Sequence, residues 1–190
     1  EAALLETGLT PAGVLCSHAH IDHCGNSGYF QQKYHIPAAL SAPEAAICQN
    51  LLTLKCYFLT LSPAMVEQES SCMIHTPDVL LPPQDGPFSF AGAEFTLIHT
   101  PGHSPGHVCT VTPDGVCYLA DAVLSHELLG AKLPYNLSMA MCMKSREKLR
   151  GLPYDTYIMA HHGVCTGEEL PHLIDENQAL IRTRAEEIRS

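Results

Sequence analysis

The feature that most constrains this chain is a cluster of histidines and an aspartate near its N-terminus. Four candidate metal ligands, in the pattern H-x-H-x-D-H, fall within six residues: His18, His20, Asp22 and His23. In an extended segment alternate side chains project to the same side, so His18 and His20 can bind one cation. Asp22 and His23 lie where the chain turns and can face a second cation. A polar loop that is His-rich by chance explains the pattern less well, because neutral imidazole is the commonest protein metal ligand.

A two-metal site needs further ligands, and the sequence supplies three, each at the end of an expected strand. His103 lies in a Thr-Pro-Gly-His turn, Asp121 follows an apolar run, and His162 precedes a glycine. A carboxylate has two oxygens and can bridge two cations, which an imidazole cannot do. Asp121 is therefore the candidate that can serve both metals.

Composition limits the classes of protein to which the chain can belong. Its 190 residues favour a single domain over 1–190, and 46% hydrophobic against 16% charged residues exclude a disordered chain. A net charge of −10 argues against nucleic acid as a partner, and no apolar run reaches the roughly 18 residues that a membrane span needs. The nine cysteines are odd in number and form no C-x-x-C pair, which predicts reduced thiols and a cytoplasmic location.

Helical and strand patterns are mixed along the chain. The Thr-Pro-Asp-Gly sequence at 112–115 predicts a hairpin turn. The segment 56–75 has no clean period and stays unassigned. Helices are expected over 1–9, 27–34, 44–54, 138–150 and 168–188, and strands over 12–16, 36–40, 88–90, 94–99, 107–112, 115–120 and 156–160.

These elements, in this order, resemble the metallo-β-lactamase-fold hydrolase superfamily. Its members show H-x-H-x-D-H, a later T-P-G-H, an aspartate that ends a strand and a final His-Gly, and all four occur here between residues 18 and 163. The resemblance implies an α/β fold, an αββα sandwich with a two-metal centre at one edge. It implies a first metal bound by His18, His20 and His103, a second bound by Asp22, His23 and His162, and a bridging carboxylate from Asp121. His161 is the alternative to His162 as the last ligand.

One departure from the family pattern concerns the N-terminus. Family members usually begin with several strands ahead of the first helix, whereas this chain starts at that helix. We therefore expect that N-terminal strands are missing. Such a domain would be completed by a partner, as a homo-oligomer or by a domain swap.

The resemblance also implies the chemistry. A hydroxide held between two Zn²⁺ ions is a nucleophile near neutral pH, and Asp22 or Asp121 would orient it or carry its proton. His rather than Glu at position 20 favours zinc over the di-iron relatives, with iron and manganese as alternatives. The expected substrate is a small ester, thioester, lactone or amide. Glyoxalase II-like thioesterases are the closest analogues, since they use the aspartate bridge that β-lactamases lack.

Three other functions compete with this hypothesis. A nuclease or phosphodiesterase of the same fold would cleave a phosphodiester, a di-iron redox protein would need a flavin partner domain, and an incomplete fold would leave a non-catalytic metal-binding fragment. Among the remaining residues we expect His107 to support the site or the packing, His75 to lie on the surface, and Cys24 to be a buried, inert thiol.

Overall fold

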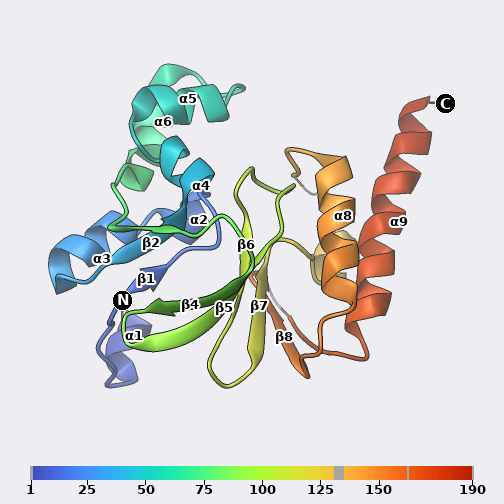
Figure 1. Ribbon diagram of the computed structural model, residues 1–190. Helices are drawn as coiled ribbons and strands as arrows, with labels where there is room; N and C mark the ends of the chain where they lie inside the picture. Colours follow the sequence, from blue (N-terminus) through green and yellow to red (C-terminus); the bar gives the residue numbers. More distant parts are fainter. Residues whose placement is uncertain (1, 131–134, 162, 190) are drawn as a thin grey trace. The chain divides into compact units, whose positions relative to one another are not determined.

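The computed structural model describes residues 2–130, 135–161 and 163–189 (Figure 1). Contacts divide the chain into two compact units. The first comprises Glu1–Pro82 and Ser89–Ala93, and the second comprises Pro83–Phe88 and Glu94–Ser190. Both units contain strands and helices, so the predicted α/β class is confirmed, and the single domain over 1–190 stays a prediction.

The first unit contains a parallel sheet in the order β1-β2-β3. Its strands are β1 (Val14–Leu15), β2 (Ala38–Ser41) and β3 (Val79–Leu81). All four residues of β2 are buried, as expected for a central parallel strand covered on both faces. Strands were predicted at the first two positions; β3 was not, because three residues between proline-rich loops show no period.

Short helices surround this sheet. The predicted helix over 44–54 is in fact two helices, because the first ends at Ile47 and Asn50 caps the start of the next. Its side-chain oxygen accepts hydrogen bonds from the backbone amides of Leu52 and Thr53, at 2.9 and 3.1 Å. The helices are α1 (Ala2–Glu6), α2 (Ile21–Cys24), α3 (Ser27–Tyr34), α4 (Ala42–Ile47), α5 (Leu51–Tyr57) and α6 (Pro63–Ser70), followed by the 3₁₀ turn η1 (Ser71–Met73).

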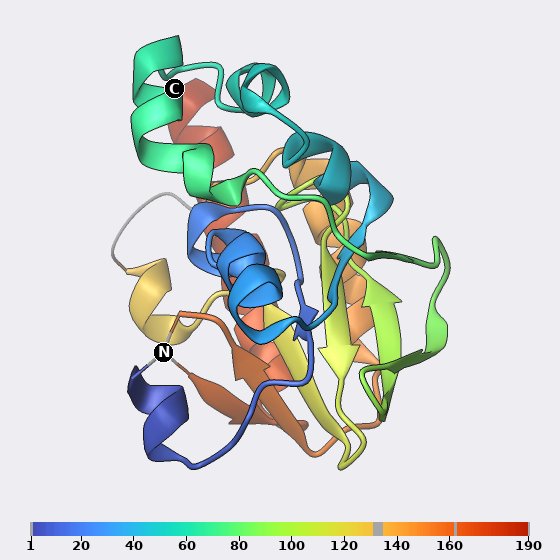
Figure 2. The same cartoon turned by 90° about the vertical axis from the view of Figure 1, so that its left-hand side faces the viewer.

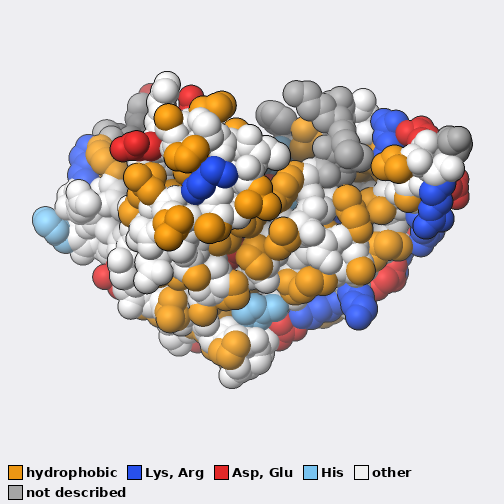
Figure 3. Space-filling view, turned by 90° about the horizontal axis from the view of Figure 1, so that it is seen from above, with side chains coloured by type: hydrophobic (Ala, Val, Ile, Leu, Met, Phe, Trp, Pro, Cys, Tyr) orange, Lys and Arg blue, Asp and Glu red, His pale blue; other side chains and the backbone are white. Residues whose placement is uncertain are grey.

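The unassigned segment therefore contains α6, which packs on α5 (Figure 2). Ser62 caps α6 through its hydroxyl, which accepts from the Met65 amide, and Pro63 starts the first turn. Figure 3 shows hydrophobic side chains gathered at the surface over these two helices. Leu52 of α5, Met65 of α6 and Leu59 between the helices are exposed. The two helices thus bury only part of their apolar surface.

The second sheet has the order β4-β5-β6-β7-β8-β9. The predicted hairpin is confirmed, since β6 and β7 pair antiparallel across the Thr-Pro-Asp-Gly turn. β8 then runs parallel to β7, and β9 returns antiparallel to β8. The strands are β4 (Gly86–Phe90), β5 (Ala93–His99), β6 (Val108–Val111), β7 (Val116–Ala120), β8 (Thr156–Met159) and β9 (Val164–Thr166).

Two long helices of the second unit, α8 (Met139–Arg150) and α9 (Leu170–Arg189), lie side by side (Figure 1). The buried positions of α8 are 142, 145, 146 and 149, which is the spacing of one helix face. The guanidinium of Arg150 joins the helices by an ion pair with Asp175, at 2.7 Å. Both helices were predicted, whereas the short α7 (His126–Leu129) was not.

Within the described ranges, no helix is both long and apolar enough to cross a lipid bilayer.

Gly102 is required both by its backbone angle and by its neighbours. Its φ is +140°, and a Cβ on it would lie 2.6 Å from the sulfur of Cys142. Gly115 also has a positive φ, +83°, but a Cβ there would meet open space. The Thr-Pro-Gly-His turn therefore passes directly against the start of α8.

Gly102→Ala should lower the free energy of unfolding by more than about 3 kcal/mol, because backbone strain and a steric clash add. Gly115→Ala, the matched control, should cost about 1–2 kcal/mol from strain alone. Urea denaturation of both variants measures the difference. Equal losses would mean that α8 moves away from the turn at little cost.

Candidate metal centre

In the first unit, the H-x-H-x-D-H motif begins where β1 ends. His18 is fully buried, and its Nε2 lies 3.0 Å from Nδ1 of His20. The Nδ1 of His18 lies 3.0 Å from the hydroxyl of Ser17, which fixes the ring from its other side. The ring of His23 lies 4.0 Å from the ring of His18, centroid to centroid. Three imidazoles therefore gather at the end of one short strand.

The chain turns within the motif, as predicted, but it does so in a short helix that was not predicted, α2. His20 has extended backbone angles and stands at the N-cap of α2, on which Asp22 and His23 lie. The side chain of His23 is nearly buried, whereas that of Asp22 is 50% exposed, and Nε2 of His23 lies 3.5 Å from Oδ2 of Asp22. The carboxylate of Asp22 is therefore accessible to solvent.

Two residues that the sequence analysis did not select hold this cluster in place. The buried carboxylate of Glu44, on α4, accepts a hydrogen bond from the backbone amide of Ala19 at 2.7 Å. Ala19 lies between the two histidines, so this bond fixes the backbone from which both project. The hydroxyl of Tyr57 lies 2.9 Å from Nε2 of His20. An acidic residue within an alanine-rich helix was the one available signal for Glu44.

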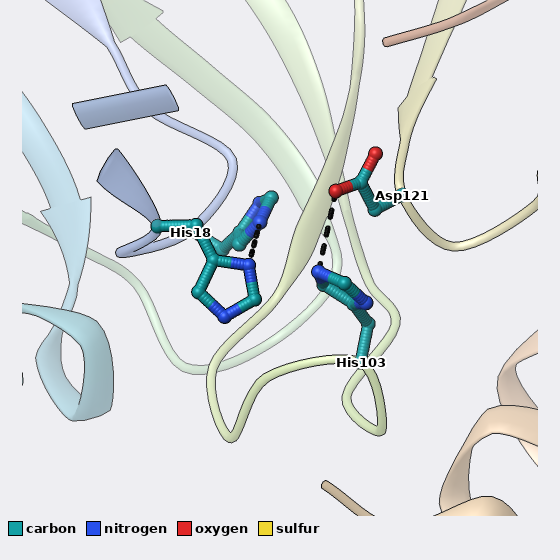
Figure 4. Close-up of side chains that lie close together, drawn as sticks. His18, His103 and Asp121 are labelled. Carbon is teal, nitrogen blue, oxygen red and sulfur yellow. Dashed lines mark hydrogen bonds and ion pairs between the residues drawn. The ribbon is translucent and has the colours of Figure 1, made fainter. Parts of the chain in front are cut away.

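In the second unit, His103 and Asp121 face each other. Nε2 of His103 lies 3.2 Å from Oδ2 of Asp121, and both side chains are more than nine-tenths buried (Figure 4). The other ring nitrogen, Nδ1, donates to the backbone carbonyl of Tyr135 at 2.9 Å. That bond leaves Nε2 as the nitrogen able to bind a metal.

Asp121 follows a strained end of β7. The pairing of β7 with β8 shifts register between Tyr118 and Ala120, and Ala120 has a positive φ of 47°. Such strain is costly for a residue with a Cβ and persists where the surroundings impose it. The bulge re-aims the chain so that Asp121 projects from the strand end.

His107 holds the backbone of Asp121. The Asp121 amide donates to Nε2 of His107 at 3.3 Å, so this nitrogen carries no proton and Nδ1 does. Nδ1 then donates to the hydroxyl of Thr100, at 2.8 Å. His107 is fully buried, and its expected supporting role is confirmed.

The last predicted ligand is His162, which lies outside the described residues. Its alternative, His161, is brought to Asp121: Nε2 of His161 lies 3.6 Å from Oδ1, whereas His103 meets Oδ2. Asp121 thus presents one oxygen to each of two imidazoles.

The prediction that His75 lies on the surface is wrong, because its ring is buried and its Nδ1 donates to the carbonyl of Met73.

The donor sets of both units fit a transition metal. Imidazole nitrogens and a carboxylate are ligands for zinc and iron. Two ligand atoms of one tetrahedral cation, each about 2.1 Å from it, lie about 3.4 Å apart. The His18–His20 and His103–Asp121 distances, 3.0 and 3.2 Å, are near that value. Each pair is therefore spaced to chelate one ion after a small adjustment.

Comparison with known proteins agrees with this interpretation. Residues 1–161 match the model of the metallo-beta-lactamase superfamily. The chain is 28% identical over 165 residues to the "Probable metallo-hydrolase YqgX" of Bacillus subtilis, covering 83% of this chain and 71% of that protein. It is 31% identical over 103 residues to "Hydroxyacylglutathione hydrolase" of Rhizobium meliloti, covering 53% of this chain and 39% of the relative.

A solved structure shows the same fold. The crystal structure of a metallo-beta-lactamase family protein from Thermus thermophilus aligns with a TM-score of 0.72 at 22% identity, covering 98% of this chain and 66% of that one. The metallo-β-lactamase fold predicted from the motifs is thereby confirmed.

Glu44→Ala should weaken metal binding about 10–100-fold, because the amide between the two histidines loses its acceptor and the ligands lose their fixed backbone. Glu44→Gln is the matched control, since its amide oxygen can still accept from Ala19. Titration with Zn²⁺ of the chelator-treated variants measures both affinities. Equal affinities in Glu44→Ala and the unmodified chain would contradict the positioning role.

Proposed function

The chain belongs to the metallo-β-lactamase superfamily, and from this premise we propose that it is a binuclear, zinc-dependent hydrolase of a small ester, thioester, lactone or amide. The superfamily match, the similarity to a probable metallo-hydrolase and the His/Asp clusters support a metal-dependent hydrolase in general. We propose in addition the number of ions, which is two, their identity as zinc, and the substrate class.

The observation that carries it is the environment of Asp121. Its two oxygens face different imidazoles, Oδ2 toward His103 and Oδ1 toward His161. A carboxylate that serves one ion needs only one oxygen, whereas one that bridges two ions offers one to each. The strained β7 end and the bond to His107 hold Asp121 in this position. This arrangement supports the proposed bridging role of Asp121.

The proposed ligand set is the one that the sequence motifs of the superfamily imply. When bound, the metal ions supply Lewis-acid chemistry, lowering the pKa of water and polarising the substrate's carbonyl oxygen. The first ion would be bound by His18, His20 and His103, the second by Asp22, His23 and His162 or His161, with Asp121 between them.

Three side chains of the protein have different roles in the proposed reaction. Asp22 is half exposed, so its carboxylate can accept a proton from the attacking water and exchange it with solvent. Asp121 is nearly buried and held by its backbone, so it orients rather than exchanges protons. The hydroxyl of Tyr57, beside His20, is a donor within reach of the same cluster.

A thioester is the preferred substrate class. The hydroxyacylglutathione hydrolase to which part of this chain is similar is named for a thioester substrate. A net charge of −10 disfavours a nucleic acid, so a phosphodiesterase activity is the second candidate.

Nine free thiols within the described residues favour the reducing cytoplasm. A homo-oligomer or domain swap stays a prediction, testable by native mass spectrometry.

Metal analysis tests the centre directly. Plasma mass spectrometry of the purified chain should find about two zinc ions per chain, and Asp121→Ala should reduce this to about one or fewer, because both ions lose a ligand. Asp114→Ala, in the exposed hairpin turn, is the control and should retain two. Of His161→Ala and His162→Ala, only one should lose metal. An unchanged stoichiometry in Asp121→Ala would refute the bridge.

Activity tests the substrate class. The zinc-loaded chain, assayed on a thioester, a lactone, a β-lactam and a phosphodiester, should hydrolyse the thioester fastest. Removal of zinc by a chelator should lower the rate by about 10²-fold or more, and added zinc should restore it. Cleavage of the phosphodiester alone would replace the thioester by the second candidate. Two bound ions without any activity would favour a non-catalytic metal-binding protein.

A further inference from the structure

Two buried thiols lie in contact in the first unit, outside the set of metal ligands. Cys24 and Cys48 are both fully buried, and their sulfurs are 3.8 Å apart. Cys24 is the last residue of α2, and Cys48 directly follows α4. The two sulfurs therefore join the helix that presents Asp22 and His23 to the helix that presents Glu44.

A histidine stands beside this pair. The backbone amide of His75 donates to the carbonyl of Cys48 at 3.2 Å, and the imidazole interacts with the Cys48 thiol. Because Nδ1 of His75 donates to the Met73 carbonyl, Nε2 is the nitrogen able to accept a proton. This Nε2 is buried, and among the described residues it has no partner in normal hydrogen-bond geometry.

A cavity of about 290 Å³ reaches this histidine from the surface. It is lined by residues of the first unit, including Gln49, Thr76, Leu80 and His75 itself. The cavity has room for a molecule much larger than water, so it can bring a small oxidant as far as His75, and a local opening beside His75 would expose Cys48.

The local charges favour Cys48 as the more acidic thiol. The hydrogen bond from the Cys24 thiol lowers the pKa of Cys48, burial opposes this effect, and His75 reinforces it. The same contact raises the pKa of Cys24. Burial alone would lower the pKa of His75, but the neighbouring Cys48 thiol and the hydrogen bond to the Met73 carbonyl raise it. Glu44 and Cys16 also face the pair and disfavour a second negative charge.

We propose that Cys24 and Cys48 form a reversible disulfide with a hydroperoxide as oxidant, and that this disulfide shifts α2 and weakens metal binding by Asp22 and His23. The pairing rests on the thiol geometry alone. Its effect on the metal rests on the proposed function.

The oxidation takes two steps. Cys48 transfers its proton to His75, and the thiolate attacks one peroxide oxygen; the O–O bond breaks, giving a sulfenic acid on Cys48 and, after protonation, water. The sulfur of Cys24 then attacks the Cys48 sulfur, the S–O bond breaks, and a second water leaves with the Cys24 proton. In sum, two thiols and one hydrogen peroxide give one disulfide and two waters. A dithiol reductant reverses the reaction.

The disulfide requires movement, and α2 is the element that can move. The sulfurs must close from 3.8 Å to about 2.05 Å. α2 is a single turn of four residues that ends at Cys24, whereas α4 follows directly on the fully buried β2. A shift of α2 changes the positions of Asp22 and His23 but leaves His18 on the preceding segment. The expected loss is therefore of one ion rather than of both.

The test is peroxide oxidation of the metal-loaded chain, followed by blocking of free thiols in denaturant and peptide mapping. The mapping should find a Cys24–Cys48 disulfide, and the metal content after gel filtration should fall from about two ions to about one. A dithiol reductant and added zinc should restore both. Cys117→Ala, which removes a buried thiol of the second unit, is the matched control and should behave like the unmodified chain.

Three variants test the individual roles. Cys48→Ala should retain two ions after peroxide treatment, and so should Cys24→Ala. If Cys48→Ala does not fold, Cys24→Ala still tests the thiol pair. His75→Gln should form the same disulfide about two- to threefold more slowly, since the imidazole that lowers the pKa of the Cys48 thiol is lost.

The outcomes separate the two proposals. A disulfide from Cys48 to Cys16, or oxidation confined to the exposed Cys56 and Cys72, would overturn the pairing. A Cys24–Cys48 disulfide with two ions retained would overturn its effect on the metal. A chain that binds no metal before oxidation would refute the proposed function and this effect together, while peptide mapping would still decide the thiol pair.

Discussion

Buried carboxylates need donors, and this requirement organises the ligand-bearing segments of both units. A carboxylate removed from water is costly unless hydrogen bonds or opposite charge compensate it. Glu44 is compensated in part by the amide of Ala19, and Asp121 lies against the ring of His103. In each unit the compensation fixes a segment that carries candidate metal ligands. The polar groups that support the site thus also make the local fold specific.

The two carboxylates have different roles for a physical reason. Glu44 accepts from a backbone amide, so it holds the direction in which His18 and His20 project. Asp121 is itself aimed at imidazoles, and its own backbone is held by His107, whose ring is oriented by Thr100. A residue that is to bind metal must keep its oxygens available, so its orientation has to come from the main chain. The strained φ of Ala120 is the cost of that orientation.

The proposed disulfide would link the redox state to the metal site. Cys24 follows His23 directly, so any change in the sulfur contact acts on the same helical turn that carries a ligand. Along the sequence, Cys24 and Cys48 are separated by two helices and a strand and look like ordinary buried cysteines. Their contact, and the burial of His75 beside them, come from the parallel pairing of β1, β2 and β3.

The sequence by itself determined the class of fold, the family and the candidate ligands, because these depend on local spacing. H-x-H in an extended segment, the Pro-Gly turn before His103 and an apolar run before Asp121 each have a meaning within a few residues. Only the tertiary structure decided which residues support the ligands. Glu44 reaches Ala19 across 25 positions, and Asp121 meets His107 across 14. Such partners are chosen by how strands and helices pack, and no periodicity in the sequence encodes a contact between two separate elements.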